Sequence, residues 1–158
     1  MAEPTGYLQW NVQEIASALK IRREDVLKYF TDGRKVAFIF ERRLTNEFLG
    51  GDLACSEGAD YDICDEEGLR WEVRSISTRT YFCPSYMVGS GRKFNEEGFL
   101  RKIKGIAGYI LVDIGQFPNV PFWKVAAADV LLWYKNGHLG AGTHTSRPKV
   151  LQLIKELP

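Results

Sequence analysis

The sequence predicts an α/β protein that folds as one domain, residues 1–158. Its 158 residues are an ordinary length for a domain, and 45% hydrophobic and 13% aromatic residues are enough to form a core. Residues 109–114 are an apolar run typical of a strand buried on both faces, and the helical spacing of residues 95–106 precedes it. Strict alternation of polar and apolar residues over residues 60–76 adds two further strands.

Composition sets limits on location and partners. The net charge of +1 says little about binding, because the distribution of charge matters more than its sum. Cys55, Cys64 and Cys83 are odd in number and form no CxxC pair, so we expect reduced thiols in a cytoplasmic protein. No stretch approaches the ~20 apolar residues of a membrane span, and residues 1–4 do not resemble a signal peptide, so no membrane association is expected.

Residues 7–31 predict two short helices within an N-terminal helical extension, residues 1–32. Asn11 is expected to cap the first helix. This segment resembles a helix-turn-helix, in which three basic residues would contact phosphates or bases: Arg22, Arg23 and Lys28. The favoured interpretation is a helical hairpin that packs on the core or forms a dimer surface, because a third helix of a compact DNA-reading unit is missing.

Residues 33–49 predict a third helix that ends at Gly50-Gly51. Its apolar face is expected to contain Val36, Phe40, Leu44 and Phe48. Two carboxylates on this helix are candidates for a functional site, Glu41 and Glu47. Glu41 is preferred because it lies on the buried flank, whereas Glu47 is expected to be solvated.

The alternating segment predicts a hairpin with a polar turn at residues 65–68. Paired strands would bring Asp62 and Glu72 to one point, where two carboxylates repel unless a cation lies between them. Oxygen ligands of this kind suit Mg²⁺. The alternative is a pair of solvated side chains, but apolar neighbours such as Trp71 and Val73 indicate a buried strand, in which charges need partners.

The segment 75–94 interleaves basic, hydroxyl and aromatic residues around Gly89-Ser90-Gly91, which favours contact with DNA over an ordinary surface loop. The expected DNA-binding residues are Arg79, Tyr81, Ser90, Arg92 and Lys93, with Lys102 and Lys104 on the helix that begins at Asn95. These two lysines face either DNA or solvent.

The C-terminal third predicts a strand at residues 122–125, a helix at 128–134 and a short terminal helix at 150–157. The Gly-rich, basic tail between the last two, residues 135–149, is either a DNA contact or an exposed hairpin. Its two histidines, His138 and His144, lack partners at metal-binding spacing, so neither is expected to be catalytic.

Asp62, Glu72 and the residue two positions later, Arg74, resemble the PD-(D/E)xK signature of restriction-endonuclease-like nucleases. The helix at residues 32–44 resembles the opening helix of that family, and the order of the later elements is similar over most of the chain after residue 33. The resemblance implies a restriction-endonuclease-like core at residues 33–158, with a central mixed β-sheet flanked by helices.

The resemblance also implies a function. Asp62, Glu72 and the carbonyl of Val73 would hold Mg²⁺, for which Mn²⁺ can substitute, Glu41 would support the site, and Arg74 would stabilise charge on phosphorus. The implied activity is hydrolysis of double-stranded DNA by a type II restriction endonuclease or its small catalytic subunit, with a homodimer or a second subunit needed to cut both strands. Alternatives are a Holliday-junction-resolvase-like nuclease and a weak or inactive DNA-binding protein with the same fold.

Two positions depart from the family pattern. Tyr61 replaces the proline before the first Asp, and Arg74 replaces the lysine, although arginine cannot release a proton in a protein. Three explanations remain open: the attacking water needs no such base, Lys102 or Lys104 reaches into the site, or the protein is a weak or inactive nuclease.

Overall fold

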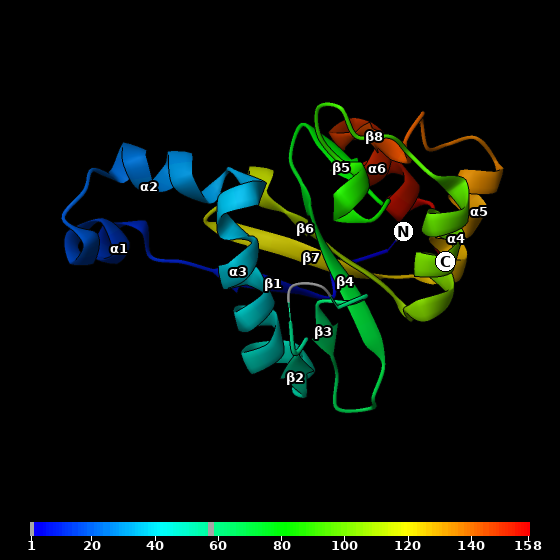
Figure 1. Ribbon diagram of the computed structural model, residues 1–158. Helices are drawn as coiled ribbons and strands as arrows, with labels where there is room; N and C mark the ends of the chain where they lie inside the picture. The colour runs from blue at the N-terminus through cyan, green and yellow to red at the C-terminus, as the bar shows by residue number, and fades with distance from the viewer. Residues whose placement is uncertain (1, 57–58) are drawn as a thin grey trace.

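The computed structural model describes residues 2–56 and 59–158 and has an α/β architecture built on two sheets (Figure 1). The larger, six-stranded sheet has the order β1-β7-β6-β4-β3-β2, and β5 pairs with β8 in the smaller one. The strands are β1 Gly6–Gln9, β2 Asp52–Leu53, β3 Ile63–Cys64, β4 Arg70–Ile76, β5 Arg79–Tyr81, β6 Gly108–Asp113, β7 Asn119–Ala126 and β8 His144–Ser146. The α-helices are α1 Val12–Leu19, α2 Arg23–Phe30, α3 Gly33–Leu44, α4 Glu96–Gly105, α5 Ala127–Lys135 and α6 Arg147–Lys155.

The large sheet is mixed. Strands β4 and β6 are parallel and α4 lies between them in the chain, while the other neighbours in this sheet are antiparallel. A parallel pair requires a crossover, and α4 supplies it. The expected α/β fold with a central mixed sheet is therefore confirmed at this level of description.

Helices cover both faces of the sheet. One core joins α1, α2 and α3 to alternate strand residues such as Ile110 and Val112, and the other joins α4, α5 and α6 to Tyr109 and Leu111. Side chains alternate between faces along a strand, so the two cores divide the residues of β6 between them. All six residues of β6 are buried, which confirms the expectation of a strand covered on both sides.

The N-terminal segment is not purely helical, because its first element is a strand. Residues of β1 pair with β7 at the edge of the large sheet, in a register that places Leu8 opposite Val120. The two predicted helices follow, and the backbone N–H of Glu14 donates to the side chain of Asn11 at 3.1 Å, as expected of a cap. The segment is thus tied to the domain by a strand that the sequence did not indicate.

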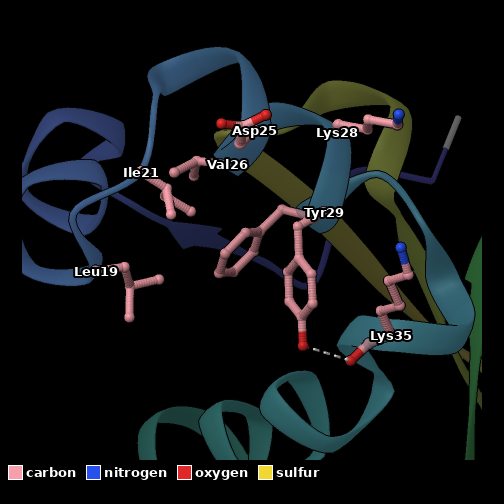
Figure 2. Close-up of a pocket in the computed structure, with 8 residues that line it drawn as sticks. Leu19, Ile21, Asp25, Val26, Lys28, Tyr29 and Lys35 are labelled. Carbon is pink, nitrogen blue, oxygen red and sulfur yellow. Dashed lines mark hydrogen bonds between the residues drawn. The ribbon is translucent and has the colours of Figure 1, made fainter.

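Helices α1 and α2 agree with the interpretation of a helical hairpin packed on the core. Val26 and Phe30 of α2 are buried, and Arg22 is occupied by an ion pair with Asp25. A hollow of about 580 Å³ lies among the end of α1, α2 and the start of α3, and Tyr29, which lines it, donates from its hydroxyl to the carbonyl of Lys35 (Figure 2). Its lining is mainly apolar but also contains Lys28 and Lys35.

The third helix was predicted in one piece but changes character at Thr45. α3 is followed by a π-helical turn, Thr45–Leu49, closed by the N–H of Gly50 and the carbonyl of Thr45 at 2.9 Å. The wider turn shifts the apolar face by one residue. Leu49 is therefore buried, whereas Phe48, which was expected on the apolar face, is 45% exposed.

The predicted hairpin is present. β3 and β4 are antiparallel, with Ile63 opposite Trp71, and the turn contains Gly68 at a φ of 82°. Asp65 holds the turn, because its carboxylate accepts from the backbone N–H of Leu69 at 2.9 Å and from the indole N–H of Trp71 at 2.8 Å. This local network fixes the register that positions the residues on either side of it.

The remaining predicted elements are confirmed with shifted bounds: β7 and α5 are longer than expected, α4 is slightly shorter, and α6 begins and ends earlier. The C-terminal tail, expected to be either a DNA contact or an exposed hairpin, contains the strand β8. β8 pairs with β5 and places His144 opposite Tyr81. Within the described residues, no helix has the length and apolar character needed to cross a bilayer.

Candidate functional site

Asp62 lies where two strands separate. Its backbone N–H still bonds to the carbonyl of Trp71 at 3.0 Å, in line with the β3–β4 ladder. Beyond this point its carboxylate, rather than another strand residue, accepts from the N–H of Val73 at 2.8 Å. The N–H and C=O of one strand residue point to the same edge, so the Val73 carbonyl also faces this fork.

Glu72 points to the face of the sheet that α4 covers, and it is 4% exposed. Its Oε1 lies 2.8 Å from a guanidinium nitrogen of Arg74, and its Oε2 lies 2.5 Å from the ammonium of Lys102. Both carboxylate oxygens of Glu72 therefore lie beside a cation of the protein. Of the two candidate lysines, Lys102 reaches Glu72, whereas Lys104 is exposed.

Arg74 is held by the protein as well as by Glu72. The same guanidinium nitrogen donates to the carbonyl of Cys83 at 2.9 Å, and the neighbouring Phe82 carbonyl accepts from the hydroxyl of Tyr109 at 2.6 Å. The buried Nε of Arg74 has no hydrogen-bond partner among the described residues. One N–H donor of the rigid Arg74 guanidinium is therefore buried without an acceptor among the described residues.

Glu41 approaches from α3 and shares a hollow with Asp62. Burial, followed by the charge of Asp62, raises the pKa of Glu41 to about 7. Burial, followed by the charge of Glu72, raises the pKa of Asp62 to about 6, against the opposing effects of the Val73 N–H and of Arg74. Both shifts indicate buried negative charge without enough compensation. Glu47, by contrast, forms an exposed ion pair with Arg43 at 2.9 Å, in agreement with the preference for Glu41.

The donor set fits a hard divalent cation in part. Asp62 lies at the fork near enough to Glu72 for the charge of Glu72 to raise its pKa, and the Val73 carbonyl faces the same edge as Asp62. The described residues contain no group of three or more His, Cys, Asp or Glu side chains placed to hold a metal ion, so Glu41 does not join them as a third direct ligand. The reason is that α3 and α4 cover opposite faces, and Glu72 turns towards α4.

Two hollows flank these residues. The Phe38 hollow, about 460 Å³, contains both Glu41 and Asp62 and is completed by Phe38, Arg42, Leu53, Ala54, Cys55, Ser56 and Tyr61. The Arg79 groove, about 880 Å³, begins at Val73 and Arg74 and extends between the start of α3 and the β5 region, past Arg34, Ser75, Ser77, Thr78, Arg79, Tyr81 and Ser85. Basic and hydroxyl side chains dominate its polar lining, as phosphate contacts require.

Helix α3 can form a wall of the groove because it approaches β4 closely at Gly33. A β-carbon at position 33 would lie 2.9 Å from both Cβ and Oγ of Ser75. Asp32 caps the helix, accepting from the N–H of Arg34 at 3.1 Å. The close contact fixes the position of α3, and with it the direction from which Glu41 reaches the fork.

The predicted DNA-binding residues occupy different places. Arg79 and Tyr81 line the groove next to Arg74. Ser90, Arg92 and Lys93 are exposed on the segment before α4, where Arg92 donates to the carbonyl of Ser85 at 3.2 Å. None of these three lines the two hollows, and Lys102 is drawn into the ion pair with Glu72.

Sequence reasoning missed Arg34 of the groove and Phe38 and Arg42 of the hollow. Ser75, Ser77 and Thr78, which also lie in the groove, belong to the segment 75–94 that was expected to contact DNA, but they were not among its named DNA-binding residues. Phe38 was detectable in principle, because it is an aromatic residue off the apolar stripe of Val36, Phe40 and Leu44. The groove residues carried no such signal, since they gather only when β5 returns beside α3.

In comparisons with known proteins, no protein-family model, no curated protein and no solved structure matches this chain. The residues and their geometry are therefore the basis for a functional proposal.

Proposed function

We propose that the protein is a metal-dependent DNA endonuclease that hydrolyses phosphodiester bonds at the fork between β3 and β4, of the type II restriction class or a small subunit of one. The observation that carries the proposal is the group of carboxylates around Asp62, in which the pKa values of Glu41 and Asp62 are raised. Three carboxylates, Glu41, Asp62 and Glu72, lie among three cations, Arg42, Arg74 and Lys102.

The raised pKa values support a divalent cation and a phosphate together. The three carboxylates equal the three cations in number, yet burial and mutual repulsion still raise the pKa values of Glu41 and Asp62. A divalent ion would favour the ionised carboxylates and would leave an excess of positive charge for a phosphodiester. Such complementarity is the expected electrostatic design of a site for phosphoryl transfer.

The ligands proposed for Mg²⁺, or for Mn²⁺ in its place, are Asp62, Glu72 and the Val73 carbonyl, and the bound ion would polarise the phosphate and lower the pKa of an attacking water. The chain's own side chains have separate tasks. Arg74, which lines the Arg79 groove, would contact a phosphate oxygen through its guanidinium, and Lys102 holds Glu72 in place and supplies the ammonium that position 74 lacks. Glu41 lies beside Asp62 as a proton acceptor with a pKa near neutrality.

The order of elements supports the same proposal. A helix that carries Glu41 precedes β2, β3 and β4, and then α4 crosses to the parallel strand β6. This is the order implied by the resemblance to PD-(D/E)xK nucleases. The Arg79 groove begins at Arg74 and gives a DNA backbone a route away from the fork. Double-stranded DNA and a second copy or subunit remain the proposed partners.

The test is cleavage of a mixture of supercoiled, linear and branched DNA in the presence of Mg²⁺ or Mn²⁺, with sequencing of the ends. We expect metal-dependent cleavage that Asp62→Asn and Glu72→Gln each reduce at least about a hundredfold. Glu47→Gln is the matched control, because that carboxylate lies outside the site in an exposed ion pair.

The outcomes separate the candidate activities. Cuts at one sequence support a restriction enzyme, and cuts at branch points support a resolvase-like nuclease. Failure to cut any form with either metal, by a protein that still binds DNA, would reject the nuclease and identify a binding protein. That second function is favoured by one observation, since both oxygens of Glu72 already lie beside cations of the protein.

A further inference from the structure

The Phe38 hollow has a lining that metal binding does not explain. Besides its carboxylates, Glu41 and Asp62, the lining includes Phe38, Arg42 and Tyr61. Its volume of about 460 Å³ lies within the range of pockets that bind small ligands. A mixed aromatic and cationic lining next to a carboxylate site points to a ligand with both a planar ring and a phosphate.

Phe38 is 62% exposed, although it belongs to a helix whose apolar stripe is fully buried. The guanidinium of Arg42 lies 3.3 Å from the centre of its ring and donates to its backbone carbonyl at 3.1 Å. These contacts hold a ring and a guanidinium together at the rim of the hollow. Phe38 belongs to neither hydrophobic core, so packing within the domain does not account for it.

Tyr61 gives the hollow a second aromatic group. It is half-buried, immediately precedes Asp62, and has the guanidinium of Arg70 at 4.8 Å from its ring centre. The two aromatic side chains therefore come from separate elements, α3 and the approach to β3, and both lie next to a carboxylate of the candidate centre. Arginine and aromatic side chains are the groups on which unpaired bases stack.

We propose that the Phe38 hollow receives an unpaired nucleobase of the DNA strand whose phosphodiester lies at Asp62 and Glu72. This inference rests on the proposed nuclease activity and names a substrate class for it, DNA with an unpaired nucleotide next to the reacting phosphate, which is a substrate of the resolvase-like alternative rather than of a type II restriction enzyme. A base within a duplex is already stacked on both sides and must leave the helix to enter such a pocket, at a cost in free energy. The hollow therefore selects single-stranded, bulged or branch-point nucleotides.

The experiment measures binding without metal, so that it does not depend on cleavage. The probes are three oligonucleotides with 2-aminopurine at one position: a single strand, a duplex in which that base is bulged, and the fully paired duplex. Fluorescence anisotropy gives the dissociation constants, and quenching of 2-aminopurine reports stacking. We expect the bulged and single-stranded probes to bind about tenfold or more tightly than the paired one, because no base pair has to be opened.

Phe38→Ala should weaken binding of the bulged probe about fivefold or more and remove its quenching, while binding of the paired probe stays within about twofold. Tyr7→Ala is the matched control, because Tyr7 is an aromatic residue, 47% exposed, on the opposite edge strand β1. Replacing the bulged 2-aminopurine by an abasic site should reproduce the loss seen with Phe38→Ala. Circular dichroism of each variant establishes that it has folded.

Two results would overturn the inference: equal affinity for bulged and paired probes, or an effect of Phe38→Ala no larger than that of Tyr7→Ala. These outcomes differ from failure of the nuclease proposal. If the protein never cuts DNA but binds bulged probes through Phe38, the base pocket is supported and the nuclease proposal fails. If it cuts DNA with no preference for unpaired bases, the nuclease proposal is supported and the base pocket fails.

Discussion

Two groups of charged residues on the same sheet differ in how fully their charges compensate one another. At the end of β6, Asp113 and Arg147 form a closed pair with two parallel hydrogen bonds, 3.0 and 2.7 Å long, and each charge is compensated by the other. Around Asp62, three carboxylates lie among Arg42, Arg74 and Lys102, but the pKa values of Glu41 and Asp62 remain raised. A closed pair contributes to the fold, whereas an open group retains the capacity to bind a cation and an anion.

The largest effect is expected when the closed pair is opened. Asp113→Ala leaves the Arg147 guanidinium without its partner in a mostly buried place, so the free energy of unfolding should fall by about 3 kcal/mol. Urea denaturation at neutral pH measures the change. The matched control is Glu97→Ala, which breaks the exposed pair with Arg101 and should leave the midpoint of denaturation nearly unchanged. Equal effects of the two substitutions would contradict the comparison.

Removing a cation from the open group should impair activity. Lys102→Met leaves Glu72 with Arg74 alone and removes a positive charge from the group, so metal-dependent cleavage should fall about a hundredfold. Lys104→Met, on the exposed side of the same helix, is the control and should keep the wild-type rate. If both variants cut DNA equally well, the assignment of Lys102 to the site is wrong.

Removing a carboxylate from the open group should increase the free energy of unfolding, whereas Asp113→Ala should decrease it. Asp62→Asn retains an oxygen that can accept from the Val73 N–H but eliminates a buried charge, so the metal-free protein should gain about 1 kcal/mol at pH 8. Urea denaturation in a chelating buffer tests this gain. A loss of stability on this substitution would show that the cluster is balanced in some other way.

The smallest expected effect is a pH dependence. The folded-state pKa values of Glu41 and Asp62, about 7 and about 6, exceed their ordinary values of 4.5 and 3.8, so the folded chain binds more protons than the unfolded chain between those limits. Linkage then requires that these two groups lower stability as pH rises from about 4 to about 7. The measurement is the difference in midpoint between wild type and the Glu41→Gln, Asp62→Asn double variant.

The double variant should lack this contribution, so its advantage over wild type should grow as pH rises through that window and level off above it. Saturating Mg²⁺ should reduce the difference, because a cation stabilises the ionised carboxylates. An advantage that stays constant with pH would contradict the raised pKa values.

What the sequence predicted best was local. The hairpin around Asp62 and Glu72 follows from alternation and a turn within about twenty residues, and those signals survive in any tertiary context. The preference for Glu41 over Glu47 also followed from the helical stripe. The short strands β1 and β8 were not predicted. They contain residues such as Gly6 and His144 that do not favour strands, and they form only because they pair with the distant strands β7 and β5.

The rest of the site depends on long-range arrangement. Lys102 and Lys104 are two residues apart on one helix, and only the crossover of α4 over β4 decides which of them meets Glu72. The π-helical turn that exposes Phe48 leaves no clear mark in the sequence either. The Arg79 groove joins segments more than thirty residues apart, which neither composition nor spacing can bring together.

The absence of a side chain at Gly33 connects the packing of α3 on the sheet with the geometry of the candidate site. Any other side chain there would press against Ser75 and push the start of α3 outward, and the helix, being stiff, would carry Glu41, two turns further on, away from Asp62. Glycine at position 33 therefore lets the helix pack directly against the sheet. This contact sets the separation between Glu41 and Asp62, and with it the extent to which the charge of Asp62 raises the pKa of Glu41.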